Sequence, residues 1–293
     1  SSTAAAVLSL ALIPMASAQT VLKASDVHPA GYPNVVAVEN MGKKLESATG
    51  GRYKLQMFPG GVLGSEKEVV EQTQIGAIQI ARISLGILGP VVPDVNVFNM
   101  PFVFRDEAHM RAVIDGPVGK EILDKITNSP ARLVALGWMD SGSRSLYTKN
   151  PVKTPADLKG LKMRIQSSKV LEEEMRALGA MPQVMAFSET YQALQTGVVD
   201  GTENPPSNML TQKMHEVQKY ATVTNHGYLG YAVIVNKKFW DGLPADVRGK
   251  LEQAMAESTA YANKIAKEEN DKALAAMKAA GFTPQERASF AAR

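Results

Sequence analysis

Three strand-like segments separated by two helical segments dominate the first part of the chain and constrain its fold most. Residues 21–25, 52–58 and 77–83 have the short apolar or alternating pattern of strands. Residues 35–50 repeat apolar side chains at helical spacing, and residues 65–76 open with a Ser-x-x-Glu capping box. Strands that alternate with helices predict parallel strands joined by helical crossovers. The predicted fold class is therefore α/β.

The rest of the chain predicts a second α/β unit and one very long helix. A run of small residues at 141–151 interrupts the pattern, and 293 residues are many for a single α/β unit, so we predict two lobes. The helix at 243–280 would extend over ~50 Å and so run across both lobes. The other predicted elements are helices at 105–114, 117–127, 168–178 and 188–196, strands at 131–138, 144–149, 161–165, 219–224 and 231–236, and a loop at 197–206.

The N-terminus has the composition of a secretory signal peptide. Residues 1–18 carry no charge, form an apolar stretch and end in Ala16-Ser17-Ala18, which is an A-x-A cleavage pattern. The basic start of such a peptide is missing, and a buried N-terminal helix is the alternative interpretation. We predict a signal peptide at 1–18, a mature chain that begins near Gln19, and a location outside the cytoplasm.

Charge, cysteine content and motif spacing argue against several functional classes. The formal net charge is +3 without any long basic run, whereas nucleic-acid binding needs clustered basic side chains. The chain has no cysteine, which excludes disulfides and thiol nucleophiles. His215 begins a zinc-helix pattern, but Lys219 stands where the second histidine is needed, and "SGSRS" has an arginine where a nucleophile elbow requires glycine. We expect no nucleic-acid partner, no metal, no cofactor and no enzyme activity.

Arg164 is the most informative polar residue at the end of a predicted strand. In "LKGLKMRIQSSKV" (158–170), apolar residues alternate with Lys162 and Arg164, which places Arg164 at the carboxyl end of a short strand. Ligands of open α/β sheets bind outside these ends. The other polar residues predicted at strand ends or turns are His28, Arg82, Arg144 and Asn204. Each has a structural alternative: a solvated or ion-paired arginine, a turn asparagine or a helix-entry histidine.

One long stretch resembles a known family. "LKGLKMRIQSS…LGAMPQVMAFSETYQALQTGVVDGTENP" resembles the hallmark segment of the solute-binding proteins of TRAP transporters, the DctP family, and "FPGGVLGSEKE", "NMPFVFRDEAHMRAVIDG" and "SGSRSLYT" extend the similarity. Members are periplasmic receptors that deliver organic acids to a membrane permease. The resemblance implies a two-lobe periplasmic binding-protein fold of type II-like topology, which closes on its ligand about a hinge. We predict lobes of 19–141 plus 230–269 and of 142–229 plus 270–293, a permease partner, and a monomer.

The resemblance also assigns ligand contacts in the second lobe. The arginine of the K-x-R segment, which clamps the ligand carboxylate, is Arg164 here, and the asparagine of the D-G-x-E-N segment is Asn204. Arg144, in G-x-R, corresponds to a second contact, and Phe187 is expected to pack on the carbon skeleton of the ligand. The alternatives are a core position for Phe187 and, for Arg164, a permanent salt bridge to Asp157 or Glu172.

The first lobe is expected to bind the far end of the ligand. "DVHPAGYPNV", "LGSEKE" and "ARIS" are similar to the subgroup that binds sugar acids such as uronates. Glu66 would accept hydrogen bonds from hydroxyls, with His28 and Arg82 completing the wall, while a helix-first-turn acid is the alternative for Glu66. Gln166 and Ser84 complete the predicted ligand-binding set. Because the chain departs from the subgroup at Ser84 and elsewhere along this wall, a C4-dicarboxylate, an aldonate or another hydroxy acid stays open, as does a ligand-sensing role.

Overall fold

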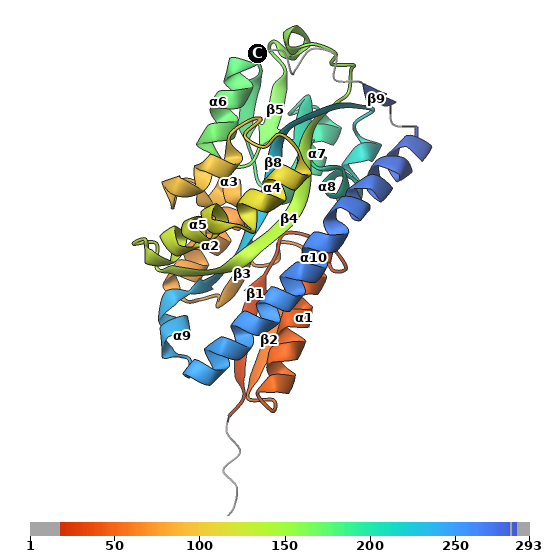
Figure 1. Ribbon diagram of the computed structural model, residues 1–293. Helices are drawn as coiled ribbons and strands as arrows, with labels where there is room; N and C mark the ends of the chain where they lie inside the picture. Colours follow the sequence, from red (N-terminus) through yellow and green to blue (C-terminus); the bar gives the residue numbers. More distant parts are fainter. Residues whose placement is uncertain (1–17, 282, 286–293) are drawn as a thin grey trace, which may run out of the picture.

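The computed structural model describes residues 18–281 and 283–285, which form an α/β protein around one twisted sheet (Figure 1). All but one residue of the predicted signal peptide lies outside this range. The strand order is β2-β1-β3-β8-β4-β7-β5-β6, with β9 beside β8. The strands are β1 (Thr20–Ser25), β2 (Tyr53–Phe58), β3 (Ile80–Ser84), β4 (Leu133–Thr148), β5 (Lys162–Ile165), β6 (Met181–Val184), β7 (Gly201–Asn204), β8 (Tyr220–Asn236) and β9 (Thr283–Gln285).

Helices cover both faces of the sheet, and several begin where the sequence predicts. The side chain of Ser65 accepts a hydrogen bond from the backbone of Glu68, whose carboxylate in turn accepts from the backbone of Ser65 at 2.7 Å, so the capping box is confirmed. The helices are α1 (Pro33–Ala48), α2 (Glu66–Ile75), α3 (Leu85–Leu88), α4 (Glu107–Ile114), α5 (Pro117–Asn128), α6 (Lys169–Ala177), α7 (Thr190–Thr196), α8 (Pro206–Thr211), α9 (Lys237–Gly242) and α10 (Ala245–Ala279). Short 3-10 turns lie at Pro93–Asn99, Pro155–Leu158, Phe187–Glu189 and Met214–Glu216.

Two pairs of predicted strands are each a single long strand in the structure. The segments predicted at 131–138 and 144–149 are joined in β4, and those at 219–224 and 231–236 are joined in β8. β4 and β8 pair antiparallel, with register irregularities near Asp140 and Arg144. The intervening Ser and Gly residues suggested a break, but bulges allow an extended backbone to bend there without ending the ladder. The prediction of separate strands was wrong at this point.

The segment predicted as a loop at 197–206 contains β7, a further correction. β7 pairs antiparallel with β4 and parallel with β5, and all four of its residues are buried. Its sequence, "GTEN", has no apolar alternation. A strand whose polar side chains are buried by ion pairs and hydrogen bonds leaves no hydrophobic period to recognise.

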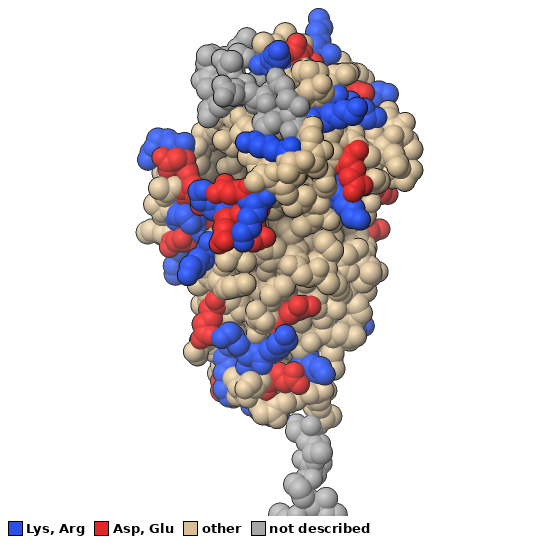
Figure 2. All heavy atoms as spheres, turned by 90° about the vertical axis from the view of Figure 1, so that its right-hand side faces the viewer, with Lys and Arg blue, Asp and Glu red and all other residues tan. Residues whose placement is uncertain are grey.

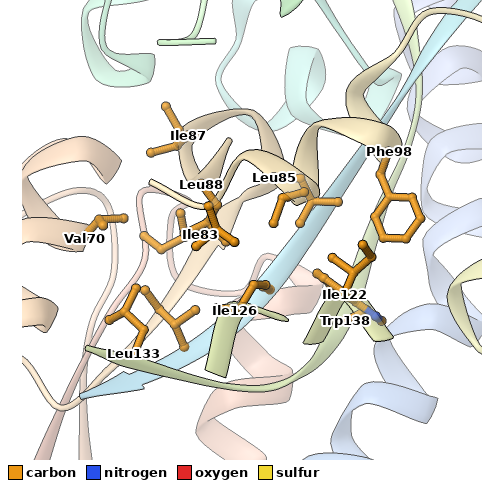
Figure 3. Packing of buried hydrophobic residues seen from close by; sticks show 14 of the residues in the cluster. Val70, Ile83, Leu85, Ile87, Leu88, Phe98, Ile122, Ile126, Leu133 and Trp138 are labelled. Atoms are coloured by element: carbon orange, nitrogen blue, oxygen red, sulfur yellow. The ribbon is translucent and has the colours of Figure 1, made fainter. Parts of the chain in front are cut away.

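The sheet carries two lobes, as predicted. One lobe is built on β2, β1 and β3 with α1 to α5, the other on β7, β5 and β6 with α6 to α8, and β4 and β8 pass through both (Figure 1). Buried apolar side chains such as Ile83, Phe98 and Trp138 pack between sheet and helices of the first lobe (Figure 3). The second lobe has its own smaller cores around Leu171 and Leu194.

The long predicted helix is confirmed as α10. Its 35 residues extend over ~50 Å and pack on α1 at one end and on α8 at the other. Figure 1 shows it beside both lobes, and on that side of the molecule Lys and Arg side chains intermingle with Asp and Glu (Figure 2). Within residues 18–281 and 283–285, no helix is both long and apolar enough to cross a membrane.

Candidate functional site

A small cavity lies between the lobes, where β1, β3, β5 and β7 end. Its volume is about 20 Å³, close to the space of one water molecule. The lining residues are Val27, His28, Glu66, Ser84, Arg164, Gln166, Phe187, Asn204, Asn208, Leu229 and Tyr231. Seven of the nine predicted ligand-binding residues therefore meet here, although they come from distant parts of the sequence. Arg82 and Arg144 do not line this cavity.

Arg164 enters the cavity from β5 and is almost fully buried, with 3% of its surface exposed. Its Nε and Nη2 donate to the carbonyl oxygen of Met185 at 3.1 and 2.9 Å, and its guanidinium lies 5.6 Å from the ring centre of Phe187. Burial lowers the pKa of Arg164 to about 10, so the group is still cationic near neutral pH.

No carboxylate of the described residues forms a salt bridge with Arg164. The two alternative partners are engaged elsewhere: Glu172 pairs with Lys169 and Arg176 at 2.9 Å, and Asp157 accepts from backbone N–H groups of its own turn. The permanent salt bridge weighed as an alternative is therefore absent. Arg164 is a buried cation that has no ion-paired carboxylate in the described structure, and the charges of Glu203 and Glu66 act on it only from a distance.

Arg82 behaves in the opposite way. Its guanidinium contacts both carboxylate oxygens of Asp26 and donates to Glu66 at 3.0 Å, while it stacks over the ring of Tyr231 at 4.0 Å. Burial alone would lower its pKa, but the adjacent carboxylates of Asp26 and Glu66 raise it. Arg82 therefore lies behind the cavity wall as the cation of an ion-pair cluster that contains two carboxylates.

Glu66 and Ser84 form the polar wall in front of that cluster. Glu66 is the first residue of α2, and its carboxylate accepts from the backbone N–H of Ser84 at 2.9 Å and from the Ser84 hydroxyl at 2.8 Å. The Glu66 carboxylate thus lies in the first turn of a helix and also lines the cavity.

Arg144 lies outside the cavity lining. From β4, its Nη1 donates to both carboxylate oxygens of the buried Glu203 at 2.8 and 2.7 Å. His226 and Glu174 complete a buried cluster around this pair, with His226 Nε2 at 3.9 Å from Glu203 and 4.0 Å from Glu174. Burial lowers the pKa of His226 to about 3, so this histidine is neutral.

Three buried donors or acceptors that line the cavity have no hydrogen-bond partner among the described residues. They are His28 Nδ1, Gln166 Nε2 and Asn204 Nδ2. Buried polar atoms are almost always hydrogen-bonded in native proteins, so three unpartnered atoms around one cavity indicate a place where a polar ligand belongs. With Arg164 beside them, they favour an anion that carries oxygen atoms.

Four lining residues were not predicted from the sequence. Val27 lies beside the predicted His28, and Leu229 and Tyr231 lie on β8, where the period-two pattern could have placed both on one face. Asn208 lies on α8, four residues after the end of β7 at Asn204, in a segment without a predicted helix. A Pro-Pro pair before it, at the first helical position, was the available signal.

The chain matches a known protein family over most of its length. Residues 24–292 match the model of the family "bacterial extracellular solute-binding protein, family 7", DctP. The C4-dicarboxylate-binding periplasmic protein DctP of Rhodobacter capsulatus is 54% identical over 281 residues, which are 95% of this chain and 84% of that protein.

Crystal structures of TRAP periplasmic solute-binding proteins have the same fold. One, from Pseudomonas putida F1 with bound D-glucuronate, is 50% identical, with a TM-score of 0.89 over 91% of this chain and 87% of that chain. Another, from Sulfurospirillum deleyianum with bound succinate, is 38% identical, with a TM-score of 0.87 over 92% of this chain and 88% of that chain. This chain therefore belongs to the DctP family of bacterial extracellular solute-binding proteins.

Proposed function

We propose that this protein is the solute-binding receptor of a TRAP transporter, and that it captures a sugar acid with one carboxylate, a uronate, between its lobes. The observation that carries the proposal is Arg164, a buried guanidinium without a carboxylate partner among the described residues. A buried unpaired charge is costly, and a ligand carboxylate would supply the missing counter-charge through two parallel hydrogen bonds. Binding and burial of Arg164 would thus favour each other.

The opposite wall supports a sugar acid more than a C4-dicarboxylate. Arg82 and Arg144 are already paired with carboxylates, so neither offers a second site for an anion. The group that faces the far end of the cavity is the Glu66 carboxylate, which accepts hydrogen bonds from hydroxyls and repels a second carboxylate. The structure from Pseudomonas putida with bound D-glucuronate supports the same choice.

A C4-dicarboxylate is the second candidate. It is favoured by the name of the Rhodobacter capsulatus relative and by the succinate bound in the Sulfurospirillum deleyianum structure. An aldonate would satisfy the same groups as a uronate and stays within the proposal. Uncharged sugars are disfavoured, because they would leave Arg164 without a counter-charge.

Capture would proceed by closure of the lobes. A cavity of about 20 Å³ is far smaller than the few hundred Å³ of ordinary ligand sites, so a uronate can enter only if the lobes separate. β4 and β8 connect the lobes, and the register irregularity near Asp140 adjoins the boundary predicted at 141–142. A hinge there, in β8 near 229–230 and along α10 would absorb the rotation.

The cellular setting follows from the receptor role. We infer a periplasmic location, a membrane permease as the partner that receives the ligand, and a monomer that binds without chemical turnover. A sensor that reports the same acid to another membrane protein would use the same cavity.

A thermal-shift series tests the proposal. The mature chain is heated with D-glucuronate, D-galacturonate, aldonates, succinate, malate and neutral sugars, alongside Arg164→Ala and the exposed control Arg176→Ala. Ligand at about 100 times its Kd adds about 2.7 kcal/mol, which is a shift of roughly 5–10 °C. Uronate shifts that disappear only in Arg164→Ala are expected. Shifts by dicarboxylates alone would favour the second candidate, and uronate shifts that survive in Arg164→Ala would refute the carboxylate clamp. NMR of the recovered acid should show no conversion.

A further inference from the structure

Asn208 lines the cavity but has no polar atom left for a ligand. Its Oδ1 accepts from the hydroxyls of Tyr32 at 2.7 Å and Ser141 at 3.2 Å. Its Nδ2 donates to Asn204 Oδ1 at 3.1 Å and to Tyr231 Oη at 3.4 Å. A side-chain amide has two acceptor sites and two N–H donors, so these four contacts use its whole capacity.

The bond to Asn204 determines what that residue can offer a ligand. Since Asn204 Oδ1 accepts from Asn208, its amide cannot turn the oxygen toward the cavity without breaking the bond. Asn204 Nδ2 is buried and has no partner among the described residues. Asn204 therefore presents an N–H donor at the cavity, because Asn208 holds its oxygen.

The hydrogen bond from Asn208 to Tyr231 influences, in a similar way, which ring nitrogen of His28 carries the proton. Tyr231 Oη accepts from Asn208 Nδ2 and lies 3.0 Å from His28 Nε2, an imidazole nitrogen that can accept a hydrogen bond from the phenol hydroxyl. Burial lowers the pKa of His28 well below its usual value, so the ring is neutral and carries one N–H. If Nε2 accepts, the proton is on Nδ1, the buried atom that has no partner among residues 18–281 and 283–285. The ring is stacked on Tyr32 at 3.9 Å, which opposes its rotation.

We propose that Asn208 is a positioning residue that sets the hydrogen-bond polarity of the cavity, making Asn204 Nδ2 and His28 Nδ1 donors to the oxygen atoms of the ligand. Tyr32 and Ser141, which hold its Oδ1, come from α1's N-terminal side and from β4, whereas Asn204 ends β7. The donor array is complete only when these elements are together, so its formation accompanies closure. The effect on ligand binding rests on the proposed function, but the tautomer of His28 does not.

The tautomer is measured first, without ligand. Two-bond ¹H–¹⁵N NMR of the ¹⁵N-histidine-labelled chain distinguishes Nδ1–H from Nε2–H, and His28→Gln assigns the signal. We expect Nδ1–H in the wild type and a shift toward Nε2–H in Asn208→Leu, where the Tyr231 hydroxyl loses its donor. An Nε2–H ring in the wild type, or an unchanged ring in Asn208→Leu, would overturn the proposal. If Asn208→Leu does not fold, Tyr32→Phe provides the same comparison with a smaller shift.

The second measurement is a calorimetric double-mutant cycle with D-glucuronate. Asn208→Leu is expected to weaken binding about 10- to 100-fold in the wild type, and by a smaller factor in the Asn204→Ala background, where only the effect through His28 remains. Asn236→Leu, which removes a buried amide at the C-terminal end of β8 that donates to the Thr73 carbonyl at 2.8 Å and does not line the cavity, controls for stability: it should lower Tm and leave Kd unchanged. Equal losses in both backgrounds would mean that Asn208 does not act through Asn204. A wild type with the predicted tautomer and no affinity for glucuronate would refute the proposed uronate function and leave the role of Asn208 in place.

Discussion

The two walls of the interlobe cavity are both polar, yet they differ in how far their charges are satisfied. On the wall formed by β1, β3 and α2, Arg82 is enclosed by Asp26 and Glu66, and Glu66 is further bonded to Ser84. On the wall formed by β5 and β7, Arg164 has only a backbone carbonyl, and Asn204 and Gln166 have unpartnered donors among the described residues. Burial is similar on both sides, so the pairing of an arginine, and not its depth, distinguishes the structural cation Arg82 from Arg164, the proposed ligand-binding one.

The largest expected effect is on the free energy of unfolding, and it tests the contrast between the paired Arg82 and the unpaired Arg164. Arg82→Met leaves two buried carboxylates without their cation and should lower the free energy of unfolding by ~3–5 kcal/mol. Arg164→Met is the matched control, because it removes an equally buried arginine that has no carboxylate partner in the described structure. Its free energy of unfolding without ligand should stay the same or rise. Urea denaturation measures both, and equal losses in the two variants would contradict the distinction.

A smaller effect, on ligand affinity, tests whether Glu66 of the first wall discriminates between uronates and dicarboxylates. Glu66→Gln keeps the shape of the side chain and removes its charge, so hydroxyl donors are held less strongly. Uronate binding should weaken by about 1.5 kcal/mol, or roughly tenfold, while succinate should lose less or even gain affinity. Calorimetry with both acids gives the ratio. A parallel loss for the two ligands would show that Glu66 does not discriminate between them.

Neither the pairing of these arginines nor the continuity of the sheet could be predicted from the sequence. Arg82 and Arg164 both lie at predicted strand ends, but the carboxylates that neutralise Arg82 come from Asp26 and Glu66, which only the fold brings to it. Strands, crossovers and the long helix follow from apolar periodicity, which is local. β7 is buried through polar contacts and has no such period, so sequence patterns missed it.

Glu174 lies behind the second wall and titrates with pH. Its titration changes the free energy of unfolding by about 1 kcal/mol per pH unit. Burial, together with the nearby Glu203 carboxylate, raises the pKa of Glu174 from 4.5 to about 8. The folded protein then keeps a proton that the unfolded chain releases, so the free energy of unfolding falls as the pH rises between these values, by at most ~1.4 kcal/mol per unit. The facing groups Arg144, Glu203 and His226 are common to wild type and Glu174→Gln. Urea denaturation from acid to mildly alkaline pH should show a shallower decline in the variant, and parallel curves would contradict this.

The smallest expected effect concerns the contact between the walls at Gly86. A Cβ at this position of α3 would overlap the Gln166 amide, which reaches toward it from the second lobe. Gly86→Ala should therefore displace that amide and weaken uronate binding about threefold to fivefold, with little change in stability. Gly249→Ala, on an open surface of α10, is the control: it should raise stability and leave affinity unchanged. Unaltered binding in Gly86→Ala would remove Gln166 from the set of ligand contacts.

The most direct test of the proposal that Arg164 binds the ligand carboxylate removes each of the two charges in turn, the guanidinium from the protein and the carboxylate from the ligand. Calorimetry would compare D-glucuronate with D-glucose, which lacks the carboxylate, on the wild type and on Arg164→Ala. We predict that the wild type prefers glucuronate by at least ~3 kcal/mol, about 100-fold, and that Arg164→Ala binds the two sugars about equally. An Arg164→Ala variant that retains the wild-type preference for glucuronate would show that another group holds the carboxylate, and would contradict the account.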